Sequence, residues 1–204
     1  MVITVEQLKK QYFNFSDIKG KISREIKRGN LFPLVKGLYE TNSRTNGEKL
    51  AQFIYGPSYL SFDYVLYKEQ LIIETVYKTY TCATLKKRKI KKYKNHFGYY
   101  TYRDIPKDVY YLGVSLCVED GYSYQIASAE KALCDKLYTI SPVKNIKEFE
   151  ELLFEDLRID EEKFNNLNKE DILRMAPLYH STNLNFLMKY IKVGNRWIKY
   201  WNKC

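Results

Sequence analysis

The residues best suited to chemistry in this chain of 204 residues are basic side chains that gather in two places. The stretch KKRKIKKYK, residues 86–94, packs seven basic side chains into nine positions. The segment SDIKGKISREIKRGN, residues 16–30, interleaves further lysines and arginines with isoleucines at four-residue intervals. With a net charge of +10 and a sequence pI near 9.2, these clusters predict a polyanionic partner.

Residues 16–30 have the pattern of an amphipathic helix. Ile18, Ile22 and Ile26 form its apolar face, Ser16 is the expected N-cap, and Gly29 or Asn30 supplies the left-handed stop at its end. The other face is basic, which favours contact with DNA, although a solvated basic face is the simpler alternative for any single helix.

The elements around this basic helix complete a recognisable order. Thr4 can cap a preceding helix with Val5, Leu8 and Tyr12 at helical spacing, and LFPLVKGLYE (31–40) predicts a small β-hairpin. Helix, basic helix and hairpin is the order of a winged helix-turn-helix, in which the basic helix enters the major groove and the wing holds phosphates. The predicted DNA-binding residues are Lys19, Lys21, Ser23, Arg24, Lys27, Arg28 and, from the wing, Lys36.

Gly20 complicates this assignment. It falls where a turn between a second and a third helix is expected, so that either the second helix is very short or Gly20 lies inside one longer helix.

Residues 74–126 are rich in Tyr, Val, Thr and Ile with intervening turns, which predicts the strands of a sheet. Within it, KTYTCATL (78–85) runs into the basic stretch, which returns through GYYTYRDI (98–105). An extended basic stretch has lysines on both faces, so neither face can be buried, and a projecting solvated arm is expected. Protection of a sheet edge is one role for it; contact with DNA or RNA is the other, because Tyr93, Tyr99, Tyr100 and Tyr102 lie nearby. The predicted secondary nucleic-acid contacts are Lys86, Lys87, Arg88, Lys89, Lys91, Lys92, Lys94 and Arg103.

Helices are predicted on either side of this sheet. Residues 46–55 have a helical pattern, and Ser61 is the expected cap of a helix over 62–69, which makes PSYLS (57–61) a corner. Ser128 can cap a helix with Ala132, Leu133 and Leu137 on one face, and helical patterns continue to residue 192.

Two constellations on the helix that follows Ser128 suggest enzymes. Ser128 and Lys131 have the S-x-x-K spacing of some acyl-transfer enzymes, but the companion S-D-N and K-T-G motifs are absent. Glu130, Lys131, Asp135 and Lys136 imitate part of a nuclease site. A capped helix packed on the sheet, with exposed ion pairs, explains both sets more simply.

Composition narrows the remaining possibilities. No apolar run reaches the length of a membrane span and the first residues do not resemble a signal peptide, so a cytoplasmic protein without a membrane partner is expected. Four widely spaced cysteines and two histidines form no metal-ligand pattern, which predicts free thiols, no metal and no cofactor.

Three segments carry a resemblance to a known family. VKGLYE (35–40), GPSYLSFDYVL (56–66) and IASAEKALCDKLY (126–138), in this order and spacing, resemble the AbiEi family of antitoxins from type IV toxin–antitoxin systems, and the match covers nearly the whole chain. Ala129 departs from the family, whose members commonly carry proline there. The resemblance implies a repressor that binds inverted repeats in its own promoter, with two protomers per site. It also implies a C-terminal domain that counteracts a co-encoded nucleotidyltransferase-like toxin without a stable complex.

The sequence therefore predicts an α+β protein that binds and does not catalyse. A winged helix-turn-helix is expected over residues 1–45, followed by a mixed α/β antitoxin domain over 46–204. That domain would hold an antiparallel-rich sheet (about 74–126) and a helical part (about 128–192). The alternative is a nuclease-like nucleic-acid-processing enzyme, or a general RNA-binding protein that uses residues 86–94.

Overall fold

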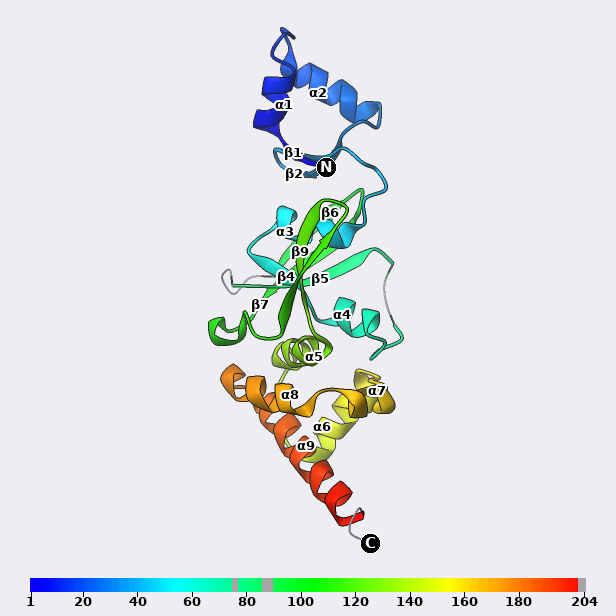
Figure 1. The fold of residues 1–204 in the computed structure, drawn as a ribbon, viewed down its shortest axis with the longest axis vertical. Helices are drawn as coiled ribbons and strands as arrows, with labels where there is room; N and C mark the ends of the chain where they lie inside the picture. Colours follow the sequence, from blue (N-terminus) through cyan, green and yellow to red (C-terminus); the bar gives the residue numbers. More distant parts are fainter. Residues whose placement is uncertain (75–76, 86–89, 202–204) are drawn as a thin grey trace.

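A computed structural model describes residues 1–74, 77–85 and 90–201, with side chains described as far as residue 193. The molecule is elongated (Figure 1): a small N-terminal unit lies at one end, a six-stranded sheet in the middle and a group of helices at the other end. The chain is thus a mixed α+β protein, as predicted.

The N-terminal unit packs two helices on a three-stranded antiparallel sheet of order β1-β3-β2. Leu8, Ile22 and Leu31 form a core that is separate from the main one. Its elements are β1 (Val2–Thr4), α1 (Val5–Gln11), α2 (Ile18–Lys27), β2 (Phe32–Val35) and β3 (Leu38–Glu40).

The local signals of this unit are largely confirmed. Thr4 caps α1 in a reciprocal capping box with Gln7, and Gly29 ends the α2 region at a φ of 75°. The cap of α2 is Asp17, whose carboxylate accepts from the Gly20 N–H at 2.8 Å, and not Ser16. Gly20 therefore lies inside one helix, which is the second of the two alternatives. Residues 12–17, which the structure describes, form no separate short helix before it.

The central sheet has six strands in the order β6-β7-β5-β4-β9-β8. The pairs β4–β5, β6–β7 and β8–β9 are antiparallel, whereas β4–β9 and β5–β7 are parallel, so the sheet is mixed. The strands are β4 (Ser58–Leu60), β5 (Thr79–Thr84), β6 (Lys91–Asn95), β7 (Gly98–Asp104), β8 (Val114–Glu119) and β9 (Tyr122–Ala127).

The prediction for residues 57–61 was wrong. Ser58–Leu60 form β4, a fully buried strand between β5 and β9, and not a corner. Ser61 does not cap the following helix α4 (Asp63–Lys68), because its hydroxyl donates to Asp135 at 2.7 Å instead. Three residues are too few to show a strand period, and the long-range bond to Asp135 outcompetes the local cap.

The helical segment predicted over 46–55 is present as the 3₁₀ turn η1 (Gly47–Leu50) and α3 (Ala51–Ile54). Two tyrosine hydroxyls of β7 reach it: Tyr100 donates to the Gly47 carbonyl at 3.1 Å and Tyr102 to the Ala51 carbonyl at 2.7 Å. Both tyrosines are fully buried. They belong to the core and are not available for base stacking, contrary to the expectation.

The C-terminal part is helical, as predicted, and α5 lies between the sheet and the other helices (Figure 1). Ser128 is confirmed as the N-cap of its helix, and the structure adds Asn145 and Asn168 as N-caps of two later helices.

Within the described residues, no helix is both long and apolar enough to cross a membrane. The elements are α5 (Ala129–Tyr138), α6 (Ile146–Glu151), the π-helical turn η3 (Leu152–Asp156), α7 (Glu161–Asn166), α8 (Lys169–Met175), η4 (Ala176–Tyr179) and α9 (Thr182–Trp201), with the 3₁₀ turn η2 (Lys107–Val109) before the last hairpin.

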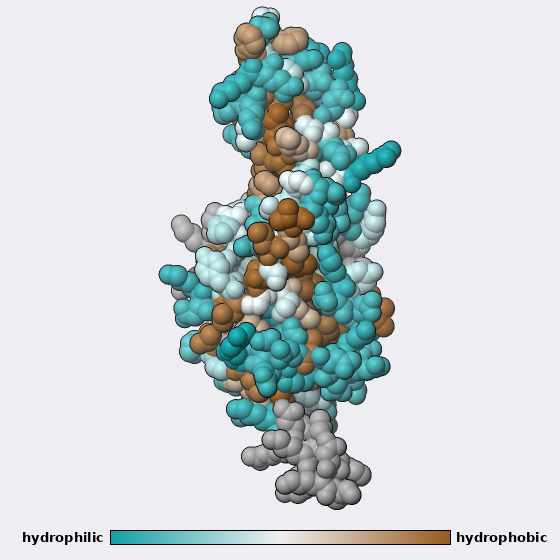
Figure 2. All heavy atoms as spheres, viewed as in Figure 1, coloured by the Kyte–Doolittle hydropathy of each residue, from teal (hydrophilic) through white to brown (hydrophobic). Residues whose placement is uncertain are grey.

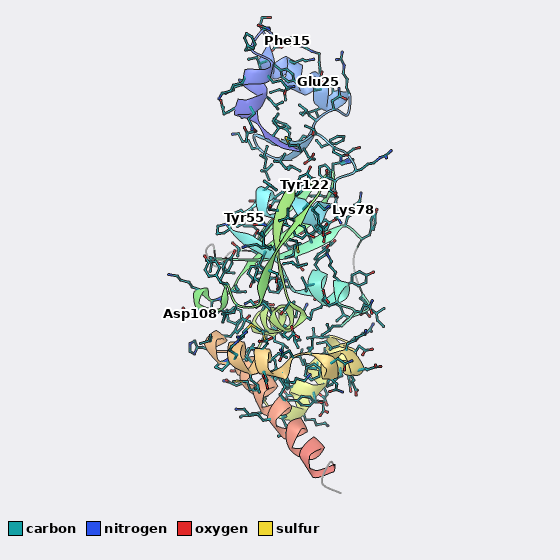
Figure 3. The ribbon with its side chains drawn as sticks, in the orientation of Figure 1. Phe15, Glu25, Tyr55, Lys78, Asp108 and Tyr122 are labelled. Atoms are coloured by element: carbon teal, nitrogen blue, oxygen red, sulfur yellow. The ribbon has the colours of Figure 1, made fainter. Side chains whose placement is uncertain are left out.

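Specific contacts join the N-terminal unit to the sheet. The Phe32 ring lies 4.6 Å from the His96 ring, and the Asn95 amide donates to the Leu34 carbonyl at 3.3 Å. Glu40, fully buried, accepts from the Tyr122 hydroxyl at 2.9 Å, and Tyr122 lies at the junction of the two parts (Figure 3). The small unit is therefore attached at defined points and not by a free linker.

Candidate nucleic-acid interface

The solvent-facing side of α2 carries most of the predicted DNA contacts. Ile22 and Glu25 face the interior, and Ile18 and Ile26 pack beside the small core. The helical period then turns Lys19, Ser23, Arg24 and Lys27 to solvent, where all four are exposed. Arg24 and Lys27 also lie in the last turn of α2, next to the partial negative charge of its carbonyl end.

Lys21 occupies a different position from the other predicted contacts. Its ammonium lies 2.8 Å from the Glu25 carboxylate and about 5 Å from the centroids of the Tyr12 and Phe15 rings, and its side chain is 19% exposed. Phe15 lies at the outer end of the unit (Figure 3). Lys21 therefore ties α2 to the loop after α1 and is less available to a phosphate than its neighbours.

Glu25 is the charged centre of this unit, and the sequence analysis missed it. The carboxylate accepts from Lys21 at 2.8 Å, from the Asn30 amide at 2.7 Å and from Arg28 at 3.4 Å. The hydrogen bond from Lys21, followed by that from Asn30, lowers its pKa from 4.5 to about 2. The i,i+4 spacing of Lys21 and Glu25 was a visible signal; the inward orientation of Glu25 was not.

The β2–β3 hairpin was predicted to be a wing, and its turn carries one lysine. Lys36 is exposed in the turn between β2 and β3, and Gly37 follows it with a φ of 80°. The Gly37 carbonyl accepts from the Val5 N–H at 2.8 Å, which fixes the turn against the start of α1. A residue with a Cβ would be strained at this φ, so Gly37 is needed to shape the turn that carries Lys36.

The basic stretch forms an edge of the sheet where the structure describes it. Lys91, Lys92 and Lys94 are exposed on β6, which pairs with β7 and has no second strand partner among the described residues. The prediction of a projecting arm is therefore corrected for residues 91–94, which are part of the sheet because they pair in register with Tyr99–Tyr102. Residues Lys86, Lys87, Arg88 and Lys89 lie outside the described residues.

Side chains along β6 and β7 alternate between the two faces of the sheet, which shows the basic residues that share a face. Lys92 pairs with Thr101 and Lys94 with Tyr99, so these lysines share a face with the exposed Arg103. Lys91 pairs with Tyr102 and lies on the opposite face. The structure thus brings together Lys92, Lys94 and Arg103, and separates Lys91 from them.

The candidate enzyme residues on α5 have structural partners. Lys131 and Asp135 are fully buried, 2.9 Å apart, and not exposed as predicted. The Asp135 carboxylate also accepts from the hydroxyls of Tyr59 at 2.9 Å, Ser61 at 2.7 Å and Tyr179 at 2.6 Å. Burial lowers the pKa of Lys131, and the charge of Asp135 opposes that shift.

The other two acidic and basic side chains of that set point elsewhere. Glu130 accepts from the Asn168 N–H at 2.9 Å, at the start of α8. Lys136 lies 2.5 Å from Asp63, at the edge of a cavity of about 600 Å³ that also contains the ion pair between Arg158 and Glu74. The four residues therefore do not converge on one reacting centre. Ser128 caps α5 at the Lys131 N–H, 3.2 Å away, which accounts for the S-x-x-K spacing.

The possible metal ligands and the thiols were compared across the described part of the chain. Among the described residues, no group of three or more His, Cys, Asp or Glu side chains is placed to hold a metal ion. Cys82, Cys117 and Cys134 are free, and burial raises the pKa of Cys82 and Cys134 well above the usual thiol value.

Comparison of the chain with protein-family models and with characterised proteins finds no match. The arguments for function therefore come from the residues and from their arrangement.

Proposed function

We propose that this protein is a DNA-binding repressor of its own promoter and an antitoxin, with residues 1–45 acting as a compact winged helix-turn-helix. The observation that carries the DNA-binding part is the exposed face of α2, where Lys19, Ser23, Arg24 and Lys27 stand on a packed helix. Arg24 and Lys27 are the contacts proposed for the major groove, and Lys36 of the wing holds a phosphate.

The antitoxin part rests on the resemblance carried by the three sequence segments. Polar residues of two of the segments meet across the fold, because Tyr59 and Ser61 both bond to Asp135. Glu40 of the first segment bonds to Tyr122, which lies outside the three segments. These bonds support a structural role for the shared residues. The residues that counteract a toxin would then lie elsewhere on the surface.

The DNA-binding proposal is tested by fluorescence anisotropy with DNA from upstream of the protein's own gene, against scrambled DNA of equal length. The double variant Arg24→Ala/Lys27→Ala is expected to weaken specific binding by about 30-fold or more, because each lost contact costs about 1–3 kcal/mol. The control variant Lys189→Ala/Lys192→Ala removes the same charge from exposed positions of α9 and should bind as the unmodified protein does. Equal losses in both variants would contradict a recognition role for α2.

The two proposed activities are separable in one experiment. The Arg24→Ala/Lys27→Ala variant is expected to lose repression of a promoter fusion but to keep protecting cells that express the adjacent toxin gene. Loss of protection by this correctly folded variant would mean that the antitoxin activity needs the DNA-binding face.

A second candidate function is general nucleic-acid binding along the β6 edge, favoured by the shared face of Lys92, Lys94 and Arg103. If these residues touch phosphates, Lys92→Ala/Lys94→Ala should flatten the salt dependence of binding, because each lost contact reduces counterion release. Lys91→Ala removes one charge from the opposite face and is the control for each of the single variants Lys92→Ala and Lys94→Ala. An unchanged slope would leave edge protection as the role of these lysines.

A further inference from the structure

The two outer strands of the central sheet differ sharply in their side chains. β6 carries Lys91, Lys92 and Lys94, which protect an edge against pairing with another strand. β8 closes the opposite end of the sheet with the sequence VSLCVE, and on its outer side it pairs with no strand of the described part of the chain. Leu116 and Val118 are 64% and 67% exposed on it. Figure 2 shows hydrophobic residues reaching the surface at the level of the sheet.

The register of the β8–β9 hairpin identifies which backbone groups of β8 point away from β9. Asp120 and Gly121 form a two-residue turn between the paired residues Glu119 and Tyr122, so Glu119 and every second residue before it bond to β9. The Gly113 carbonyl, which accepts from the Ser128 N–H at 2.7 Å, agrees with this alternation. The outward N–H and C=O groups therefore belong to Val114, Leu116 and Val118.

This arrangement is complementary to itself. If two copies of β8 pair antiparallel about a twofold axis at Leu116, the outward groups of Val114 bond to those of Val118 in the other copy, and the two Leu116 residues bond to each other. The three apolar side chains then lie in one row opposite three apolar side chains. Glu119, the only charged residue of β8, lies beyond the paired residues, so no like charges meet.

We propose that β8 is a homodimerisation edge, where a second copy of this chain adds its own β8 antiparallel to form one continuous twelve-stranded sheet. The charges support a second copy over an open chain of copies. Pairing of β8 with β6 would extend without end, and the lysines of β6 oppose it. After β8–β8 pairing, the two outer strands of the joined sheet are the β6 strands of the two copies. The lysines of β6 then protect both remaining edges against further strand pairing. This proposal does not depend on the proposed DNA-binding function.

The test is sedimentation velocity of the full chain without DNA over a range of protein concentrations. The unmodified protein should pass from monomer to dimer as concentration rises, and Leu116→Lys should remain a monomer because it sets two ammonium groups against each other. The control Ile73→Lys alters another exposed apolar residue, 85% exposed, and should dimerise normally. A monomer at all concentrations would overturn the proposal, even if β8 paired with a different protein. A dimer that Leu116→Lys leaves unaffected would also overturn it.

Cysteine crosslinking tests the register. In the proposed pairing Ser115 lies directly opposite Cys117 of the other copy, as a pair without hydrogen bonds between them, at a separation that a disulfide can span. In a Cys204→Ser background, mild oxidation should crosslink Ser115→Cys efficiently and leave the protein with Cys117 alone uncrosslinked. Cys82 and Cys134 are buried and do not interfere. Efficient crosslinking through Cys117 alone would overturn this register.

Discussion

Two helices of this protein carry the same pair of charges in opposite environments. In α2, Lys21 and Glu25 are four residues apart with their charged atoms at 2.8 Å; in α5, Lys131 and Asp135 have the same spacing at 2.9 Å. The α2 pair lies at the side of a small core and leaves an exposed basic face beside it. The α5 pair is fully enclosed, with three hydroxyls around its carboxylate. The same spacing therefore occurs beside an exposed basic face in one helix and inside the core in the other.

The two helices differ in whether their charged side chains are enclosed by other groups or exposed to solvent. Burying an ion pair is costly unless further hydrogen bonds satisfy it, and the α5 network supplies those bonds from β4, the segment after it and η4. Lys131 and Asp135 are buried and already bonded to each other and to these hydroxyls, so their charges do not reach the surface. On α2, by contrast, Glu25 pairs with Lys21 and Arg28, whereas Arg24 and Lys27 remain exposed and have no ion pair with it.

The largest expected effect comes from breaking the enclosed pair. Asp135→Asn leaves the Lys131 ammonium buried without a counter-charge and should lower the free energy of unfolding by about 3–5 kcal/mol. Lys131→Met should cost less, because the hydroxyls of Tyr59, Ser61 and Tyr179 still donate to Asp135. Urea denaturation followed by circular dichroism measures both. Equal losses would show that the carboxylate is not the centre of the network.

A smaller effect is expected from one peripheral member of the same network. Tyr179→Phe removes the donor to Asp135 and the oxygen that accepts from Lys131 at 2.6 Å, but keeps the ring. The expected loss in the free energy of unfolding is about 1–3 kcal/mol, as for other buried hydrogen bonds to charged groups. Tyr138→Phe, on a more exposed ring nearby, is the control and should change stability little.

The ion pair between Lys21 and Glu25 in α2 should make the stability of the protein depend on pH in the acidic range. The pKa of Glu25 is lowered from 4.5 to about 2 in the folded protein, so its contribution to stability is present above about pH 4.5 and is lost as the pH falls toward 2. Thermal unfolding of the unmodified protein should therefore show a steeper loss of stability across this range than unfolding of Glu25→Gln. Parallel curves for the two proteins would mean that the Glu25 contacts do not stabilise the fold.

The smallest effect on stability is expected on the exposed face of α2. Arg24→Ala/Lys27→Ala removes side chains with no hydrogen-bond partner among the described residues and should change the free energy of unfolding by no more than about 0.5 kcal/mol. Near-normal stability with lost DNA binding would complete the contrast between the two helices. A marked loss of stability would instead place these residues in the packing of the unit.

Local patterns in the sequence determined the elements whose signals lie within a few residues. The caps at Thr4 and Ser128, the apolar face of α2, the stop at Gly29 and the hairpin around Gly37 depend on contacts over three or four residues or on a single φ angle. The surface position of Arg24 and Lys27 followed from the same helical period.

Only the tertiary structure decided which charges and tyrosines are enclosed. Asp135 is paired with Tyr59, 76 residues earlier, and Ser61 gives up a local cap for the same carboxylate. Tyr100 and Tyr102 are in the core because η1 and α3 fold over β7, and β4 is a strand because β5 and β9 lie on either side of it. A periodic pattern records which residues share a face, but burial depends on what packs against that face, and those partners are distant in the sequence.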